Sequence, residues 1–343
     1  MEMRPRALDR RLTTSVCVED GSQVAAARRL AAELARRLDF DESGAGRVAL
    51  AATELATNLV KHARQGEMLL SAIERDGDPV VEILALDRGP GMPSVERCLE
   101  DGYSTAGSPG TGLGAVRRLA GALDVYSRPD GTALLARIGP SAAPRRTRDV
   151  LAISGVSVAC RGEERSGDAW DQEFDAGRHT LLVVDGLGHG ADAAVAAEAC
   201  VDAFRRRARV APAARVEALH AALRATRGGA VAVVEIDLGR RVVRYAGLGN
   251  ITGAIYGEGP VRHLVSHHGI AGHVARKIDE YSYPWPPRGM LVVHSDGVAT
   301  LRDLDRYAGL RERDPGLVAG VLYRDFARRR DDATVVVARE VAA

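Results

Sequence analysis

The first part of the chain alternates helical and strand-like patterns of apolar residues. Positions 23–38 and 46–62 have the apolar spacing of amphipathic helices. The runs MLLSAIER and PVVEILALD follow, with the turn residues DGDP between them, which predicts a hairpin in an antiparallel sheet. A helix at about 114–123 and a last hairpin, LDVYSRPDGTALLARI, complete the series. This order predicts an α/β sandwich with helices on one face.

The second part is richer in strand-like runs. These are LAISGVSVAC, HTLLVVDGLG, AVAVVEIDL, RVVRYAGLG, TGAIYG, MLVVHSDG and ATVVVAR. Ala-rich helices are expected at about 191–208 and 213–225. Two packed sheets flanked by helices would accommodate this set of elements. We find no internal repeat that relates the two parts.

A short segment rich in proline and arginine, GPSAAPRRTRD, separates the two patterns at residues 139–149. It predicts a linker between a domain at 1–138 and a domain at 150–343. The length of 343 residues also favours two domains rather than one. The fold class expected for the whole chain is α+β.

Composition narrows the choice of partners and compartment. With 47 basic and 46 acidic residues, the net charge of +1 provides no field to attract nucleic acid or an anionic membrane, so neither partner is expected. No apolar run reaches the roughly 18 residues that span a bilayer, and the start MEMRPRALDRR does not lead into a secretory segment. The four scattered cysteines, without a CxxC pair, argue against a zinc site or a disulfide framework. We expect a soluble protein of the reducing cytoplasm.

Three segments of the first domain suit nucleotide chemistry. In ELATNLVKHA, Glu54 and Asn58 are four residues apart and share a helix face, where they can hold a magnesium ion and orient a nucleophile. In LALDRGPGMP, Asp87 ends an apolar strand and can accept from an exocyclic amine, and the glycines after it let the backbone approach a planar base. In STAGSPGTGLGAVRRL, a glycine-rich loop leads into a helix whose free N–H groups suit phosphate.

Taken together over residues 10–138, these segments resemble the N box and the two glycine boxes of the GHKL (Bergerat) ATPase and kinase superfamily. The stretch DRGPGMPSVERCLEDGYSTAGSPGTGLGAVRRL resembles the RsbT-type switch kinases most, and RsbW-type anti-sigma factors next. The resemblance implies that Asn58 coordinates Mg²⁺, Asp87 recognises the adenine of ATP, and Glu54 is the base for a serine hydroxyl. Lys61 is either a phosphate contact or an exposed helix lysine. The remaining nucleotide contacts that it implies are Gly89, Gly91, Gly110, Thr111, Gly112 and Gly114.

Four aspartates of the second domain lie beside strand ends. They are Asp168 in RSGDAW, Asp185 after LLVV, Asp296 in LVVHSDG and Asp331 in DDATVVV. Carboxylates on a rigid frame are hard oxygen ligands for Mg²⁺ or Mn²⁺, and two such ions can bind phosphate and lower the pKa of a bridging water. Each one taken alone also suits a turn or a helix cap.

The motifs SGD, DGLGHG, SDG and DDATV occur in the order found in PPM-type serine/threonine phosphatases, whose fold is an αββα sandwich. The small RsbX and SpoIIE branch is the most similar, over residues 150–340. The resemblance implies that Asp185 bridges two ions beside the Gly186 carbonyl. It also implies that Asp168 supports a nearby ion, that Asp296 and Asp331 complete the pair, and that Asp332 lies outside the direct ligands.

Two residues of the same motifs stay open. His189 is either a general acid to the leaving serine oxygen or a hydrogen-bonded turn histidine. For Asn250, the sequence supports no role beyond shaping a strand turn.

A kinase beside a phosphatase favours opposed activities on one substrate. By the resemblance, that substrate is a STAS-domain protein of the RsbS, RsbR or anti-anti-sigma type, with output to a sigma factor or a second-messenger pathway. An alternative is an anti-sigma-like protein that sequesters a partner with ATP as a structural ligand, so that the phosphatase is its only activity. A third possibility is an ATP domain that regulates the phosphatase. The choice of Mg²⁺ or Mn²⁺ in the second domain stays open.

Overall fold

The computed structural model describes residues 13–75, 77–100, 112–140, 150–206, 209–302 and 304–341. The chain divides by its contacts into two compact units. The first unit combines Met1–Arg148 with Glu312–Arg324, and the second combines Asp149–Arg311 with Asp325–Ala343. The sequence predicted two consecutive domains. The structure differs in one segment, since residues 312–324 from the later half of the chain belong to the first unit.

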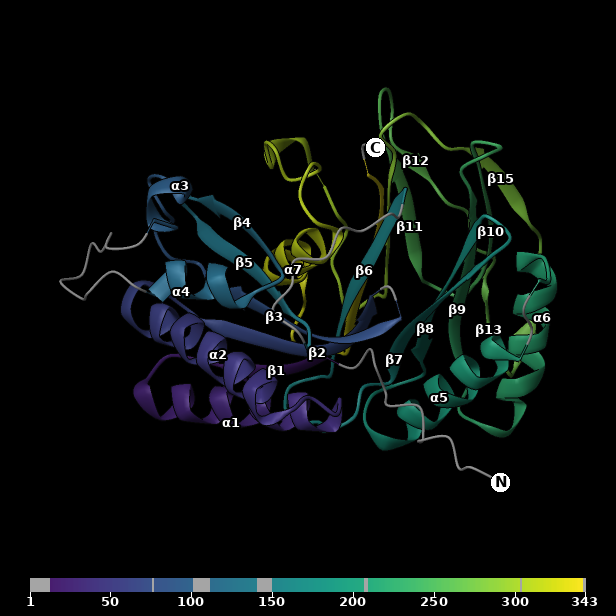
Figure 1. Cartoon of the computed structure of the whole chain (residues 1–343). Helices are drawn as coiled ribbons and strands as arrows, with labels where there is room; N and C mark the ends of the chain where they lie inside the picture. The colour runs from purple at the N-terminus through teal and green to yellow at the C-terminus, as the bar shows by residue number, and fades with distance from the viewer. Residues whose placement is uncertain are drawn as a thin grey trace. The chain divides into compact units, whose positions relative to one another are not determined.

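The first unit is built on a five-stranded sheet of order β1-β2-β3-β5-β4, in which all neighbours are antiparallel. Helices α1 and α2 run side by side along one face of this sheet (Figure 1). The short α3 and α4 precede β4 in the chain. The bounds are β1 Thr13–Cys17, α1 Gly21–Arg37, α2 Glu42–His62, β2 Glu67–Arg75, β3 Asp78–Leu86, α3 Val95–Cys98, α4 Gly112–Leu119, β4 Ala122–Arg128 and β5 Gly131–Ile138.

Successive side chains of each strand point to opposite faces of the sheet, which explains how α1 and α2 pack on one of them. Met68, Leu70 and Ile83 point to the helical face and belong to one buried cluster with Ala31 and Leu55 of the helices. Small alanines at the buried positions of α1 let the helices approach each other and the sheet closely. Asp20 caps α1 in a capping box with Gln23, which fixes where that helix begins.

A helix from the far end of the sequence belongs to the same unit. Helix α7 spans Pro315–Phe326, and every residue from Pro315 to Arg324 is buried. A Cβ placed on Gly320 would lie 3.1 Å from Leu84 Cδ2, so the helix backbone packs tightly on β3. Leu84 alternates with the helix-facing Ile83, so α7 lies on the sheet face opposite α1 and α2. The expectation of helices on one face is thus corrected by a second helical layer.

An ion network anchors this segment to the sheet. Arg137 on β5 donates from Nε to Glu82 Oε2 at 2.6 Å and from Nη2 to Asp314 Oδ1 at 2.7 Å. The side chains of Arg137 and Glu82 are 4% and 0% exposed. Burial raises the pKa of Glu82 despite the charge of Arg137. Burial also disfavours ionisation of Asp314, but the charge and hydrogen bonds of Arg137 outweigh it and hold the pKa of Asp314 below its ordinary value.

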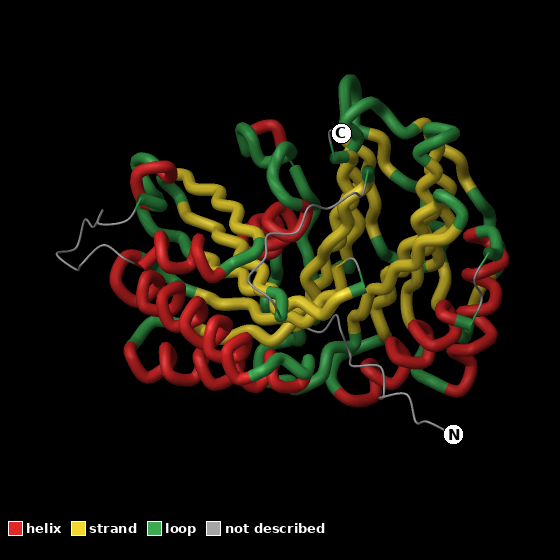
Figure 2. Tube along the Cα trace, in the orientation of Figure 1, coloured by secondary structure: helices red, strands yellow, loops and turns green. Residues whose placement is uncertain are grey.

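The second unit contains two packed five-stranded sheets of order β15-β10-β9-β8-β7 and β12-β11-β16-β17-β6. A buried cluster that includes Trp170, Tyr245, Leu291 and Val336 fills the space between them. Helices α5 and α6 cover the outer face of the first sheet through a separate cluster around Phe204. Figure 2 shows the strands of these sheets in yellow and helices α5 and α6 in red.

The elements of the second unit have the following bounds: β6 Leu151–Val158, β7 Asp168–Asp175, β8 Arg178–Gly186, α5 Ala191–Arg205, α6 Pro212–Ala222, η1 Leu223–Ala225, β9 Gly229–Asp237, β10 Val242–Leu248, β11 Thr252–Tyr256, β12 Arg262–His263, β13 Gly269–Ile270, β14 Val274–Ala275, β15 Tyr281–Pro284, β16 Met290–His294, η2 Leu304–Arg306 and β17 Ala333–Glu340.

Several sequence expectations need adjustment. The helix expected at 114–123 ends at Leu119, because Ala122 already pairs with Arg137 in the sheet. The helix expected at 191–208 ends at Arg205. Strands β1 and β7, the small hairpin β13–β14 and helix α7 were not anticipated. Most of the expected linker, residues 141–149, lies outside the described residues.

Among the helices that the structure describes, none is both long and apolar enough to cross a membrane.

We predict that Asp314→Ala destabilises the first unit by roughly 3 kcal/mol, because it leaves a buried guanidinium with half of its partners. The pKa of Asp314 is lowered on folding, so this contribution is complete above the ordinary aspartate pKa and is lost as pH falls through the folded value. Urea unfolding at pH 7 measures it. Far-UV circular dichroism follows both units, whereas Trp170 and Trp285 report the second unit alone.

The matched control is Arg313→Ala, which removes only an ion pair whose arginine is 45% exposed. Equal urea midpoints for Asp314→Ala and the control would contradict an anchoring role for the network.

Candidate functional sites

Helix α2 and the start of α4 form the first candidate site. Glu54 and Asn58 lie one turn apart on α2. A Cβ placed on Gly112 would lie 3.1 Å from Glu54 Oε2 and 3.6 Å from Asn58 Oδ1. The glycine at the N-terminus of α4 therefore lies against the carboxylate and the amide that the sequence singled out. Gly110 and Thr111 lie outside the described residues, and Lys61 is exposed in the last turn of α2.

Asp87 follows β3 and is held by backbone amides. The N–H of Gly89 donates to Oδ1 at 2.6 Å, and that of Thr132 donates to the same oxygen at 3.4 Å. Burial raises the pKa of Asp87, and these two hydrogen bonds oppose the rise. No described residue donates to Oδ2, so that oxygen can accept from the exocyclic amine of a base.

The glycines after Asp87 are required by close contacts. A Cβ on Gly89 would lie 2.9 Å from Asp87 Oδ1. Gly91 has a φ of +73°, and a Cβ there would lie 2.1 Å from the Arg128 carbonyl oxygen. Gly114 is buried inside α4. The loop after Asp87 can follow this path only with glycine at positions 89 and 91. Together with Asp87 and the Gly112 turn, these glycines are compatible with the binding of an adenine nucleotide.

The second candidate site is a cavity of about 390 Å³ at the ends of β8, β10 and β16. Asp185, Asp296 and Asp331 all line it, although they are far apart in the sequence. Its other lining residues are Leu187, Gly188, Gly229, Ala230, Gly249, Asn250, His268, Gly269 and Ile270. The structure therefore brings three of the four aspartates singled out in the sequence to one cavity.

Electrostatic crowding characterises these carboxylates. Burial, followed by the negative charges of Asp296 and Asp331, raises the pKa of Asp185 to about 7. A divalent cation relieves such repulsion, and carboxylate oxygens are the ligands that Mg²⁺ and Mn²⁺ prefer. Among the described residues, no three acidic, histidine or cysteine side chains are grouped closely enough to hold one ion by themselves. A bound ion would therefore complete its coordination with carbonyl oxygens and water.

Asp168 and Asp332 are placed differently from the three cavity aspartates. Asp168 is 4% exposed, pairs in register with Asp185 across β7 and β8, and does not line the cavity. Burial and then the charge of Asp185 raise its pKa, and its Oδ2 has no hydrogen-bond partner among the described residues. Asp332 accepts from the amides of Cys160 and Gly167, each at 2.6 Å, so its oxygens hold the backbone.

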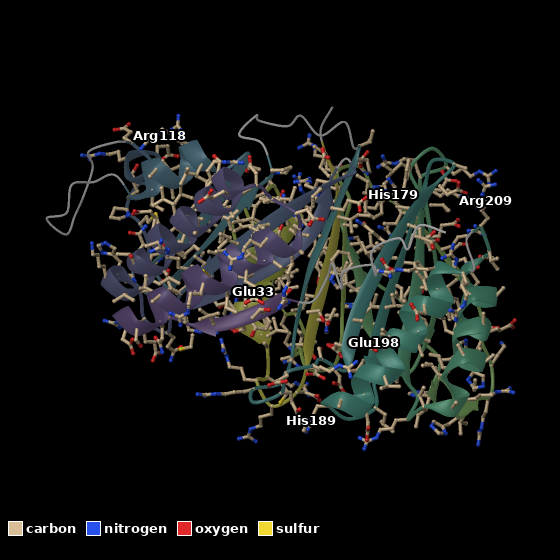
Figure 3. All side chains as sticks on the ribbon, turned by 60° about the horizontal axis from the view of Figure 1, so that its bottom comes forward. Glu33, Arg118, His179, His189, Glu198 and Arg209 are labelled. Carbon is tan, nitrogen blue, oxygen red and sulfur yellow. The ribbon has the colours of Figure 1, made fainter. Side chains whose placement is uncertain are left out.

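The neighbouring motif residues also have defined surroundings. Gly186 ends β8 and pairs with Gly229 of the cavity wall. His189, labelled in Figure 3, is 54% exposed and lies 2.8 Å from Glu163 through its Nδ1. Asn250 donates from Nδ2 to Asp296 Oδ2 at 2.7 Å, which goes beyond the turn-shaping role considered from the sequence. His268 lines the cavity and was missed, because no neighbouring motif distinguished it from the other histidines.

Known proteins match the two parts of the chain separately. Residues 18–138 match the family of histidine kinase-like ATPase domains, and residues 175–340 match the family of stage II sporulation protein E, SpoIIE. The serine/threonine-protein kinase RsbT of Bacillus subtilis (strain 168) is 36% identical over 96 residues, which are 28% of this chain and 72% of RsbT. This chain belongs to the RsbT family. Its second part is a SpoIIE-type phosphatase domain of the PPM class.

Two solved structures each resemble a little more than half of this RsbT-family fusion. One comes from work on the bacterial stressosome as a modular system adapted to control secondary messenger signalling. It has a TM-score of 0.51 and 26% identity over 56% of this chain and 100% of its own. The other is RsbX in complex with magnesium, with a TM-score of 0.51 and 18% identity over 57% of this chain and 98% of its own, which shows the fold alone. The family resemblance and the α+β fold inferred from the sequence are confirmed.

We predict that the RsbT-family fusion binds Mn²⁺ at the cavity more weakly below pH 7. Because Asp185 is protonated below its pKa of about 7, the ion has to displace a proton. Its apparent dissociation constant then rises about tenfold per pH unit. Titration calorimetry between pH 5.5 and 8, in buffers of different protonation enthalpy, measures both the affinity and the released proton. An unchanged Mn²⁺ dissociation constant between pH 6 and 7 would contradict the role of Asp185 as the group that loses a proton.

Proposed function

We propose that this chain is a bifunctional switch that phosphorylates a serine or threonine of a regulatory protein with its first unit and dephosphorylates it with its second. The observation that carries this proposal is that one chain contains both candidate sites. Glu54 and Asn58 lie against the glycine turn of α4, and Asp185, Asp296 and Asp331 share one cavity. Matches to the kinase-like ATPase family and to the SpoIIE family support one activity in each unit.

In the first unit, Glu54 would accept the proton of the attacking hydroxyl as it is phosphorylated. Its carboxylate is half-buried and lies beside Gly112, where the phosphates of ATP would meet the N-terminal end of α4. Asn58 would hold Mg²⁺ and Asp87 the adenine. The position of Lys61 at the exposed end of α2 supports no specific contact.

In the second unit, Asp185, Asp296 and Asp331 would hold two Mn²⁺ or Mg²⁺ ions, with Asp168 and the Gly186 carbonyl beside them. When bound, the ions supply an activated water and neutralise the charge of the phosphate. The chain itself would orient that reaction, since Asn250 fixes the Asp296 carboxylate by its hydrogen bond at 2.7 Å. The cavity of about 390 Å³ leaves room for a phosphoserine side chain.

The substrate we propose is a STAS-domain protein of a bacterial partner-switching module, with output to a sigma factor or a second-messenger pathway. Similarity to RsbT, and to a structure from stressosome work on secondary messenger signalling, supports this class of partner. Use of ATP and four free cysteines are consistent with a cytoplasmic location.

The alternative is a regulator that sequesters a partner and whose phosphatase is its only activity. Glu54 favours the kinase over this alternative. A half-buried carboxylate beside the expected phosphate position would repel a nucleotide that served only as a structural ligand, whereas phosphoryl transfer requires a base there.

For the phosphatase, we predict that Asp185→Asn lowers Mn²⁺-dependent phosphate release from a phosphoserine STAS-domain protein by about 100-fold or more, because it removes a carboxylate that holds the ions. Asp175→Asn is the matched control, since Asp175 lies on the neighbouring strand and its carboxylate forms an ion pair with the exposed Arg209. Equal rates in the two variants would place the reaction elsewhere.

For the kinase, we predict that Glu54→Gln slows transfer of labelled phosphate from ATP to that protein by about 100-fold or more, the scale expected for loss of a general base. ATP binding is retained, because the amide occupies the same space. Glu42→Gln in the first turn of α2 is the control. Undiminished transfer in Glu54→Gln would rule out the base assignment. No transfer by wild type, with ATP bound, would favour the sequestering regulator.

A further inference from the structure

The C-terminal end of α7 holds the aspartate proposed to recognise adenine. Arg324 donates from Nη1 to the Asp87 carbonyl oxygen at 3.1 Å, and Arg88 donates to the carbonyl oxygen of Arg324. The fit is close, since a Cβ on Gly131 would lie 2.3 Å from the Asp87 carbonyl oxygen and 2.7 Å from Arg324 Nη1. Any shift of the Asp87 backbone therefore moves Arg324 or breaks its hydrogen bond.

Helix α7 is fixed to the sheet along its length, so it moves as a unit. Asp314, just before the helix, binds Arg137, and Tyr323 donates to Glu67 Oε1 at 2.9 Å. Gly320 packs on Leu84 between these two contacts. Because these three contacts lie along the length of the helix, a displacement of one end is expected to move the whole helix rather than bend it.

The chain that leaves α7 enters the second unit and pairs at once with the loop after Asp296. The Phe326 carbonyl oxygen accepts from the amide of Ala299 at 2.9 Å, and the amide of Arg328 donates to Gly297 at 2.8 Å. Asp331 follows Arg328 by three residues. Two of the three cavity aspartates are thus attached to the segment that continues from α7.

We propose that α7 is a conformational coupler, through which nucleotide at Asp87 changes the order of the segments that carry Asp296 and Asp331. The path runs from Asp87 to Arg324 and then along residues 325–328 to the hydrogen bonds with residues 297–299. Coupling of this kind is reciprocal, so ions in the cavity alter nucleotide affinity by the same factor. The inference rests on the proposed nucleotide site, but it does not depend on the identity of the substrate.

Hydrogen exchange of the full-length protein tests the coupling without a catalytic readout. Exchange is followed in peptides that contain Ala299 and Arg328, at constant Mg²⁺, with and without saturating ADP. We expect ADP to slow exchange at these amides by about fivefold or more, the lower end of coupling between linked sites. Arg324→Ala abolishes the ADP response. Arg313→Ala, an arginine variant in the same segment that does not touch Asp87, retains it.

The outcomes separate the coupling from the nucleotide site. If ADP binds, as measured by fluorescence of a labelled analogue, and exchange in the two peptides is unchanged, the coupler is overturned while the kinase site stands. An undiminished response in Arg324→Ala also overturns it. Absence of ADP binding by wild type removes both the coupler and the proposed nucleotide site.

A second variant is used if Arg324→Ala does not fold, as judged by circular dichroism. Arg88→Ala changes an exposed side chain and removes a further hydrogen bond between the Asp87 loop and α7. The ADP response of Arg88→Ala is then expected to fall below that of Arg313→Ala, and an equal response would overturn the proposal.

Discussion

The buried guanidinium of Arg137 determines how this chain is divided. A positive charge that is 4% exposed on a sheet face is costly unless carboxylates surround it. Glu82 on the neighbouring strand supplies one carboxylate, and burial opposes its ionisation. Asp314 supplies the second from 177 residues further along the chain. One face of the first unit's sheet is therefore covered by a segment that follows most of the phosphatase domain in the sequence. A single domain boundary at residues 139–149 does not separate the two units.

This dependence gives the fusion a property that two separate proteins would lack. Residues 312–324, which include most of helix α7, belong to the unit that carries Asp87, whereas the residues on either side of them belong to the unit that carries the three cavity aspartates. A covalent path of seven residues joins Arg324 to Asp331. Opposed activities on one substrate would consume ATP without effect if both operated at once. A short path between the two sites is a physical means of making their states depend on each other.

The sequence predicted most of what depends on local pattern and motif. The helix that carries Glu54, the hairpin that leads to Asp87 and the strands that lead to Asp185 and Asp296 all follow from apolar spacing and turn residues. Helix α7 could not be predicted in this way, because its first eight residues, PGLVAGVL, are all apolar or glycine and show no polar face that would reveal a helical period. The role of Asn250 depends on a contact with Asp296 across 46 residues, which no local spacing encodes.

Hydrogen-bond partners distinguish the functional carboxylates better than pKa direction does. Burial raises the pKa of Asp87, Asp185 and Asp332 alike. In Asp332, however, each oxygen accepts from a backbone amide, so the carboxylate joins two loops and has little capacity left for an ion. Within the described part of the chain, one oxygen of Asp87 accepts no hydrogen bond, and Asp185 faces two further carboxylates across a cavity. These groups reduce stability as long as only protein surrounds them, and at the proposed sites a nucleotide or a cation would remove that cost. Ligand binding and local order would then be linked at both sites.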